Sequence, residues 1–143
     1  MIGVVIAAHG DLAEALLRTA ALVVRNTARV LAVSIRQEDD TQSYEARFRT
    51  AVQEVRKAST GVLVLTDMFG GTPANIGMTL HEGSEVEVLT GVNLPMLIKV
   101  LQLMQRDISL SQIARAAKES GARSIAIASE VLAGVPPLTE TKA

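Results

Sequence analysis

The sequence predicts an α/β fold, in the form of an open, mostly parallel sheet with helices on both faces. Apolar segments of strand length alternate with amphipathic segments of helix length, strand then helix four times, which is the pattern of βαβ units. Several strand segments are continuous apolar runs, as expected of strands covered on both faces. With 143 residues, 48% of them hydrophobic and 20% charged, the chain suits one folded domain. The pattern is compatible with both common strand orders, and we adopt the flavodoxin-like order, in which the first and third strands flank the ligand-binding crevice.

The first elements follow in order from the N-terminus. Residues 2–8 (IGVVIAA) form an apolar run and the predicted first strand. A helix is predicted from Asp11, with Asp11 and Glu14 as an acidic variant of the capping box. Its inner stripe consists of apolar residues at helical spacing, namely Leu12, Leu16, Ala20 and Val23. Residues 29–35 (RVLAVSI) are the predicted second strand.

The middle of the chain repeats this pattern. A helix is expected to open at Thr41 or Ser43, after a polar loop. Its inner face has four residues at helical spacing, namely Tyr44, Phe48, Val52 and Val55. Residues 61–66 (GVLVLT) are the predicted third strand. After a short loop, Pro73 suits the first turn of a helix that runs to about His81.

The last third contains two more predicted strands. Residues 85–90 (EVEVLT) alternate and predict the fourth strand. The helix after it starts near Pro95 with Asn93 as its cap, and a further helix is capped by Ser109. Residues 123–129 (RSIAIAS) predict a fifth strand that no helix follows.

Composition excludes several classes of protein. Lys and Arg number 14 against 15 Asp and Glu, a net charge of −1 that excludes a strongly basic nucleic-acid binder. Three aromatic residues are too few for a surface that stacks bases. Without cysteine, disulfides, thiol catalysis and Cys-ligated zinc are excluded. The apolar start has no basic region before it and is far shorter than the ~20 residues of a membrane span, so we expect a cytoplasmic protein.

Polar side chains and glycines gather where the predicted first and third strands end. His9 follows the first strand and precedes a helix, where unpaired helix N–H groups favour an anion. Asp67 follows the third strand, and a carboxylate there can bond one imidazole nitrogen and fix its tautomer. Gly70 and Gly71 allow backbone N–H groups to approach a phosphate, and Thr72 adds a hydroxyl. Each residue also has a purely structural interpretation, as a turn residue, a loop cap or an ordinary helix entry.

Other catalytic motifs are absent from the sequence. The patterns G-x-x-x-x-G-K-[ST], G-x-G-x-x-G and G-x-S-x-G do not occur, which argues against a nucleotide loop, a dinucleotide fingerprint and a hydrolase nucleophile. The two histidines lie far apart, so no metal site is predicted. His81 is expected near a helix end, where it compensates the helix dipole.

Three segments of the sequence resemble one known family. They are residues 3–14 (GVVIAAHGDLAE), 61–75 (GVLVLTDMFGGTPAN) and 91–97 (GVNLPML). In order and spacing they are similar to the enzyme IIA domain of the mannose family of the bacterial phosphoenolpyruvate-dependent sugar phosphotransferase system. The similarity spans roughly residues 1–130, which predicts this domain there and a C-terminal tail at residues 131–143. It implies a mostly parallel α/β sheet and a reaction without a metal or organic cofactor.

The resemblance implies a role for each residue of the two loops. His9 corresponds to the family's phosphorylated histidine, and Asp67 to the aspartate that hydrogen-bonds it. Thr72 corresponds to the hydroxyl residue of the Gly-Gly-[Ser/Thr]-Pro loop. The expected phosphate-binding residues are Gly10, Gly70, Gly71 and Thr72. Phe69 stands where some members carry Trp, and we consider it a docking residue for partner proteins, together with Asn93; simple packing is the alternative for Phe69.

The resemblance also implies partners. The family accepts a phosphoryl group from the histidine-containing phosphocarrier protein HPr and passes it to a IIB component, here a separate chain, in sugar uptake through a membrane IIC/IID complex. Members form homodimers by exchanging a C-terminal strand, here near residues 123–129. Alternatives are a phosphorylation-dependent regulatory module without a transport role, the phosphoryl-donor subunit of dihydroxyacetone kinase and a small-ligand-binding flavodoxin-like module. The sugar and the reacting ring nitrogen of His9 stay open.

Overall fold

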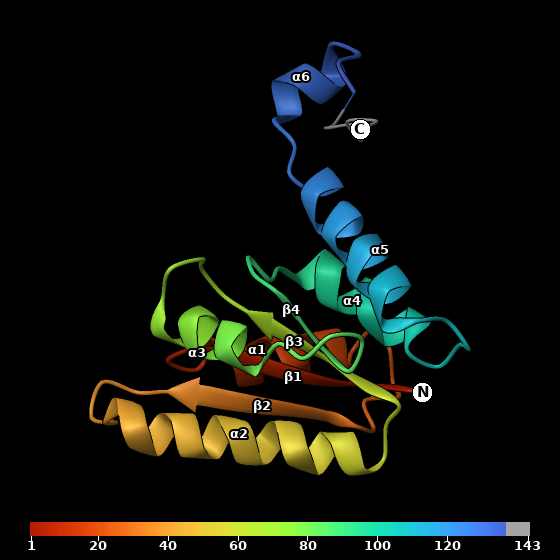
Figure 1. Cartoon of the computed structure of the whole chain (residues 1–143). Helices are drawn as coiled ribbons and strands as arrows, with labels where there is room; N and C mark the ends of the chain where they lie inside the picture. Colours follow the sequence, from red (N-terminus) through yellow and green to blue (C-terminus); the bar gives the residue numbers. More distant parts are fainter. Residues whose placement is uncertain (137–143) are drawn as a thin grey trace.

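The computed structural model describes residues 1–136, and within them the chain forms four strands and six helices around one sheet (Figure 1). The strands are β1 (Ile2–His9), β2 (Val30–Ile35), β3 (Gly61–Thr66) and β4 (Val86–Leu89). They lie in the order β2-β1-β3-β4, and every neighbouring pair is parallel. The predicted α/β class and the flavodoxin-like strand order are confirmed.

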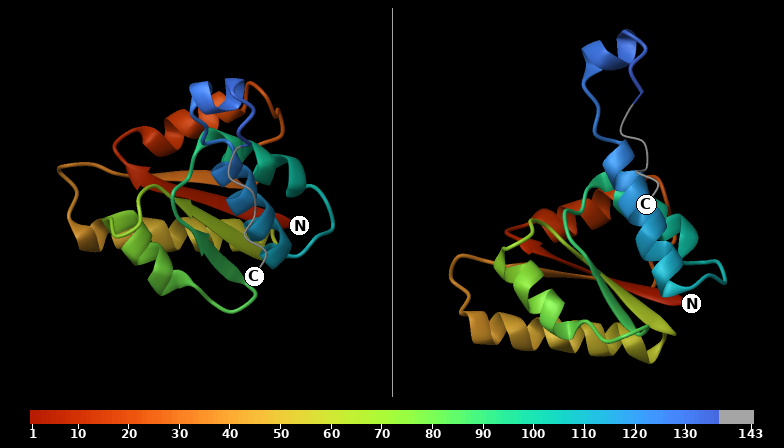
Figure 2. Two further views of the ribbon diagram at one scale, coloured as in Figure 1. Left: turned by 90° about the horizontal axis from the view of Figure 1, so that it is seen from above. Right: turned by 45° about the horizontal axis from the view of Figure 1, so that its top comes forward.

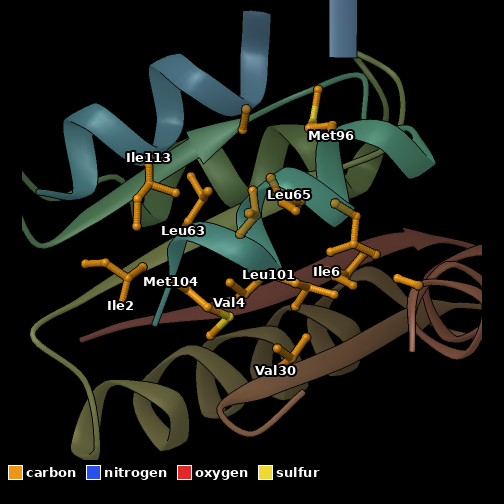
Figure 3. Packing of buried hydrophobic residues seen from close by; sticks show 14 of the residues in the cluster. Ile2, Val4, Ile6, Val30, Leu63, Leu65, Met96, Leu101, Met104 and Ile113 are labelled. Carbon is orange, nitrogen blue, oxygen red and sulfur yellow. The ribbon is translucent and has the colours of Figure 1, made fainter. Parts of the chain in front are cut away.

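Helices cover both faces of this sheet, as predicted (Figure 2). The helices are α1 (Leu12–Ala20), α2 (Thr41–Lys57), α3 (Thr72–Leu80), α4 (Leu94–Leu103) and α5 (Leu110–Arg123), followed by α6 (Ala128–Leu132). One face packs against α1, α4 and α5, and the other against α2 and α3. Strand β1 is buried on both sides, because Val4 and Ile6 join the first cluster and Val5 and Ala7 the second. Figure 3 shows the first cluster, where Leu101 of α4 packs among the strand residues.

Two helix starts and one helix face form as the sequence predicts. Asn93 caps α4, because its side-chain oxygen accepts a hydrogen bond from the Met96 N–H at 3.0 Å. Ser109 caps α5 and forms a complete capping box with Gln112. The four predicted inner residues of α2, Tyr44, Phe48, Val52 and Val55, are all buried.

The start of α1 differs from the prediction. Asp11 occupies the N-cap, but its side chain makes no capping bond, so the predicted capping box with Glu14 is wrong. The Asp11 carboxylate instead accepts a hydrogen bond from Arg36 Nη1 at 2.6 Å. The Glu14 carboxylate accepts a short hydrogen bond from the Ser34 hydroxyl. The two carboxylates therefore bind donors from β2 and the loop after it instead of the N–H groups at the start of α1. The helix also ends before Val23, the last residue of the predicted stripe, which is 61% exposed.

The predicted fifth strand at residues 123–129 does not form within this chain. Helix α5 continues through Arg123, and after a short link the five-residue helix α6 follows. Ile125 and Ile127 are 65% and 64% exposed. These alternating apolar residues have no neighbouring strand to pair with among the described residues. Whether such a segment forms a strand depends on packing against neighbouring strands. Helix α5 carries this part of the chain away from the sheet (Figure 1).

The predicted C-terminal tail, residues 131–143, starts inside α6, and residues 137–143 lie outside the described part of the chain. No helix among residues 1–136 is long and apolar enough to cross a bilayer. In an open parallel sheet, ligands bind beyond the carboxyl ends of the strands. The loops after β1 and β3 therefore hold the candidate site.

Candidate active site

His9 and Asp67 meet at the edge of the sheet where the parallel strands end. His9 is the last residue of β1, Asp67 directly follows β3, and the two strands are paired neighbours. The distance from His9 Nδ1 to Asp67 Oδ2 is 2.7 Å. The same oxygen accepts a hydrogen bond from the His9 main-chain N–H at 2.9 Å. One carboxylate oxygen therefore holds both the backbone and the ring of His9.

This pairing leaves one ring nitrogen free. An ionised carboxylate only accepts hydrogen bonds, so the proton of the neutral imidazole lies on Nδ1. Nε2 then keeps its lone pair, and it has no hydrogen-bond partner among the described residues. The His9 side chain is 44% exposed, whereas the Asp67 side chain is 12% exposed. A largely buried carboxylate thus orients an accessible, nucleophilic nitrogen.

The loop after β4 holds Asp67 in place. The Gly91 N–H donates to the Asp67 carbonyl at 2.5 Å, and the Val92 N–H donates to the Thr66 carbonyl at 2.9 Å. Gly91 has a φ of +80°, which glycine adopts without steric cost. The second carboxylate oxygen of Asp67, Oδ1, is buried without a hydrogen-bond partner among the described residues. A buried carboxylate oxygen without a partner lowers the stability of the fold.

The glycine loop brings the start of α3 against the His9 ring. Gly71 is the N-cap of α3, and a β-carbon there would lie only 3.0 Å from His9 Cε1. Gly70 has a φ of +86° and turns the chain into the helix. Thr72 is the first residue of α3, and Pro73 follows it. The first N–H groups of a helix lack partners within it and carry the positive end of its dipole, so this position favours an anion beside the ring.

Gly10 connects His9 to a second helix start. It has a φ of +58°, and its N–H donates to the Ile35 carbonyl at 2.8 Å, which ties the end of β1 to the end of β2. The N–H groups at the start of α1 receive no side-chain cap from Asp11. Both loops that contain the predicted phosphate-binding residues therefore adjoin His9: Gly10 follows it in the chain, and Gly71 lies beside its ring.

The two predicted docking residues have different surroundings. Phe69 is 74% exposed and its neighbour Met68 is 61% exposed, in the loop that also carries Gly71. Asn93 is half-buried and engaged within the chain, because its Oδ1 caps α4 and its Nδ2 donates to the Gly121 carbonyl at 3.1 Å. Its role in docking stays a prediction. Among residues 1–136, no group of three or more His, Asp or Glu side chains is arranged to hold a metal ion.

Arg36 was not recognised as a candidate site residue from the sequence, and Tyr44 was predicted only as part of a helix inner face. Arg36 follows β2 directly, and its hydrogen bond to Asp11 raises the pKa of its guanidinium. Tyr44 of α2 is fully buried and its hydroxyl donates to the Val33 carbonyl at 3.3 Å. Burial, and secondly the charge of Asp67, raise the pKa of Tyr44 above its usual value. The sequence signal for Arg36 was its place as a basic residue directly after a strand end.

Comparison with known proteins decides the family. A family model described as the phosphotransferase system (PTS) fructose IIA component matches residues 3–118. The chain belongs to this family. The family membership predicted from the resemblance of three sequence segments is thereby confirmed. The chain is a PTS EIIA component of sugar phosphotransfer.

Curated relatives lie in the same family. The chain is 29% identical over 133 residues to the PTS fructose-specific EIIA component of Bacillus subtilis, which covers 92% of this chain and 90% of the relative. It is also 29% identical over 125 residues to the PTS mannose-specific EIIAB component of Escherichia coli. That match covers 87% of this chain and 38% of the longer protein.

Solved EIIA structures share the fold. The PTS IIA protein associated with the fucose utilization operon of Streptococcus pneumoniae superposes with a TM-score of 0.81 at 28% identity, over 92% of this chain and 96% of that one. The mannose/sorbose-specific IIA subunit of Enterococcus faecalis gives a TM-score of 0.75 at 26% identity, over 87% of this chain and 92% of that one. The four-stranded parallel sheet with its helices is therefore an EIIA fold.

Proposed function

We propose that this EIIA component is a phosphohistidine carrier that accepts a phosphoryl group from HPr on His9 and passes it to a separate IIB component. The observation that carries the proposal is the 2.7 Å contact between His9 Nδ1 and Asp67 Oδ2, which leaves Nε2 as the reacting nitrogen. Membership of the EIIA family supports it. The carrier would act in the cytoplasm, beside a membrane IIC/IID complex.

The proposed transfer balances with groups of the two proteins alone. The Nε2 lone pair of His9 attacks the phosphorus of phosphorylated HPr in line, and an N–P bond forms. The N–P bond to the donor imidazole breaks, and that imidazole leaves with the electron pair. Nδ1 keeps its proton, and the Asp67 carboxylate stabilises the positive charge on the ring. Transfer to IIB runs in the same way, with the His9 imidazole as the leaving group.

The surroundings of Nε2 suit the phosphoryl oxygens. Phosphoryl transfer depends on positioning and on charge stabilisation more than on covalent machinery. The unpaired N–H groups at the start of α3 and the Thr72 hydroxyl would donate to those oxygens. Gly71 lets this backbone approach the ring, and the positive φ angles of Gly70 and Gly10 turn the chain into α3 and α1.

The test is incubation with phosphoenolpyruvate, enzyme I and HPr, followed by intact mass measurement. We expect one acid-labile phosphoryl group on the wild-type chain and none on His9→Ala. His81→Ala is the matched control and should accept the group like the wild type. Full phosphorylation of His9→Ala would contradict the proposal.

A second step of the same assay separates transport from the alternatives. Loss of the phosphoryl group to a cognate IIB component supports the carrier in sugar uptake. Retention in the presence of every cognate IIB component favours a regulatory module. Transfer to the nucleotide-binding subunit of dihydroxyacetone kinase favours the donor subunit of that enzyme.

The proposed assembly is a homodimer that exchanges its C-terminal segments. Four apolar side chains between Ile125 and Leu132 are at least half exposed, namely Ile125, Ile127, Val131 and Leu132 at 65%, 64%, 50% and 88%. Apolar surface of this kind marks an interface, and exchange with a second copy would bury it.

Sedimentation should give twice the chain mass for the wild type and a monomer for Ile127→Asp. Leu22→Asp, at an exposed apolar position elsewhere, should stay dimeric. A monomeric wild type would exclude the exchange.

A further inference from the structure

The loops at the carboxyl edge of the sheet carry a single basic side chain. These loops follow the four strands in turn and comprise residues 10–11, 36–40, 67–71 and 90–93. They contain five carboxylates, namely Asp11, Glu38, Asp39, Asp40 and Asp67, and Arg36 is their one Lys or Arg. A phosphoryl group on His9 would place up to about two negative charges on its oxygens at this acidic edge, and the positive charge of the ring would offset one of them.

Arg36 starts close to His9. In the parallel pairing of β1 and β2, His9 lies opposite Ile35, the residue before Arg36. The N–H of Gly10 also donates to the Ile35 carbonyl at 2.8 Å. The peptide group that joins Ile35 to Arg36 is therefore hydrogen-bonded to Gly10, the residue after His9.

The next arginine along the chain is already engaged. Arg47 of α2 bonds Asp39 Oδ2 at 2.8 Å and the Ser34 carbonyl at 3.3 Å. Its guanidinium also lies over the Tyr44 ring, 5.4 Å from the centroid. Three different partners thus fix Arg47 against the edge of the sheet.

Arg36 is held much less firmly. Its guanidinium bonds the single carboxylate of Asp11, and the two side chains are 48% and 76% exposed. Exposed ion pairs contribute little to stability because water and salt screen them. A doubly charged phosphoryl group accepts two parallel hydrogen bonds from a guanidinium and competes well with one exposed carboxylate.

We propose that Arg36 is the charge partner of the phosphorylated His9: it leaves Asp11 and binds the phosphoryl oxygens when the group arrives. The inference rests on the proposed function and adds a specific phosphoryl-binding residue to it. Asp11 then has the opposite effect to Arg36, because it competes for the guanidinium and repels the phosphoryl group.

The test is the equilibrium of phosphoryl exchange with HPr. Each chain is held with a defined mixture of phosphorylated and unphosphorylated HPr until its phosphorylated fraction is constant. Loss of an exposed charge-assisted contact in Arg36→Gln should lower the exchange constant about five-fold. Arg36→Lys keeps the charge but loses the paired geometry and should lie between wild type and Arg36→Gln. Asp11→Asn should raise the constant about two-fold, since the competing carboxylate is gone.

Arg49→Gln is the matched control. Arg49 also bonds one exposed carboxylate, that of Glu45, and has the same 48% exposure, but it lies on α2 rather than in these loops. It should leave the exchange constant unchanged.

The outcomes separate the two proposals. A wild-type chain that accepts no phosphoryl group overturns the proposed function and this inference with it. A phosphorylated wild type with Arg36→Gln equal to Arg49→Gln overturns the inference alone. An equal fall of the exchange constant in Arg36→Gln and Asp11→Asn also overturns the inference. The Arg36–Asp11 ion pair would then act only by holding the loop after β2 in place.

Discussion

The two histidines lie at opposite ends of α3, and each has a carboxylate near its ring. His9 lies beside Gly71 at the N-cap of α3, where an added β-carbon would be 3.0 Å from its ring, and its Nδ1 is 2.7 Å from Asp67 Oδ2. His81 is the C-cap of the same helix, and its Nε2 is 3.8 Å from Glu87 Oε1. Asp67 is 12% exposed, whereas Glu87 is 39% exposed.

The difference shows that a histidine near a carboxylate does not by itself make a phosphoryl site. The helix dipole places positive potential at the N-terminal end of α3 and negative potential at its C-terminal end. An anion is therefore favoured beside His9 and disfavoured beside His81. The Glu87 oxygen also accepts a hydrogen bond from the Val88 N–H at 2.8 Å, so it is not dedicated to the ring.

The largest expected effect separates the two carboxylates. Asp67→Asn keeps the shape of the side chain but loses the charge that holds the Nδ1 proton, and the transfer rate should fall about 100-fold or more. Glu87→Gln makes the same change beside His81 and should leave the rate unchanged. Rapid-quench transfer from phosphorylated HPr measures both. Similar rates in the two variants would contradict the role given to Asp67.

The next effect concerns the packing of the His9 ring. Gly71→Ala places a β-carbon 3.0 Å from His9 Cε1 and 3.3 Å from Met68 Cγ. The ring has to shift by a few tenths of an ångström, and a small misplacement of a reacting group should slow transfer about ten-fold. The thermal midpoint should change little, because the φ of Gly71 is −78° and suits alanine. A wild-type rate in Gly71→Ala would show that the ring position tolerates this contact.

A smaller effect distinguishes the two threonines of α3. Thr72 stands at the N-terminal end, and Thr79 stands near the C-terminal end with its hydroxyl on the Ile76 carbonyl at 2.6 Å. Thr72→Val removes one proposed donor to the phosphoryl group and should slow transfer about five-fold. Thr72→Ser should restore the rate, and Thr79→Val should leave it unchanged. Equal effects of the two valine variants would point to helix stability instead.

The smallest effect is on stability at high pH. Burial, with the charge of Asp67 as the second cause, raises the pKa of Tyr44, so the folded chain keeps the phenol neutral while the unfolded chain ionises near pH 10. Tyr44 therefore leaves the free energy of unfolding independent of pH below about pH 10 and lowers it by up to ~1.4 kcal/mol per pH unit above that value.

Denaturant titrations at several pH values measure this slope, and Tyr44→Phe should lack it. Tyr44 is the single tyrosine of the chain, so its absorbance reports ionisation directly. An early phenolate signal in the folded chain would contradict the raised pKa.

The fold was predictable where local pattern and burial agree. The run at residues 2–8 and the inner face of α2 are determined by composition and spacing within one element, and both form as predicted. The capping box at Asp11 failed because its competitor, Arg36, comes from 25 residues further along the chain. The strand predicted at residues 123–129 does not form within the single chain, because a strand needs a partner and the described residues offer none.

The site was predictable in outline only. Topology alone brings His9 and Asp67 together, since neighbouring parallel strands end at one edge. The choice of Nε2 depends on the 2.7 Å distance between His9 Nδ1 and Asp67 Oδ2, and the close approach of Gly71 on the space beside the His9 ring, where an added β-carbon would lie 3.0 Å from Cε1. No sequence pattern contains that information.

Nuclear magnetic resonance of the phosphorylated wild-type chain, with nitrogen-labelled histidine, tests the central claim most directly. Coupling between phosphorus and nitrogen identifies the ring and the atom that carry the group. We predict one phosphoryl group on Nε2 of His9 and an unchanged His81. A phosphoryl group on Nδ1 of His9, or on His81, would contradict it.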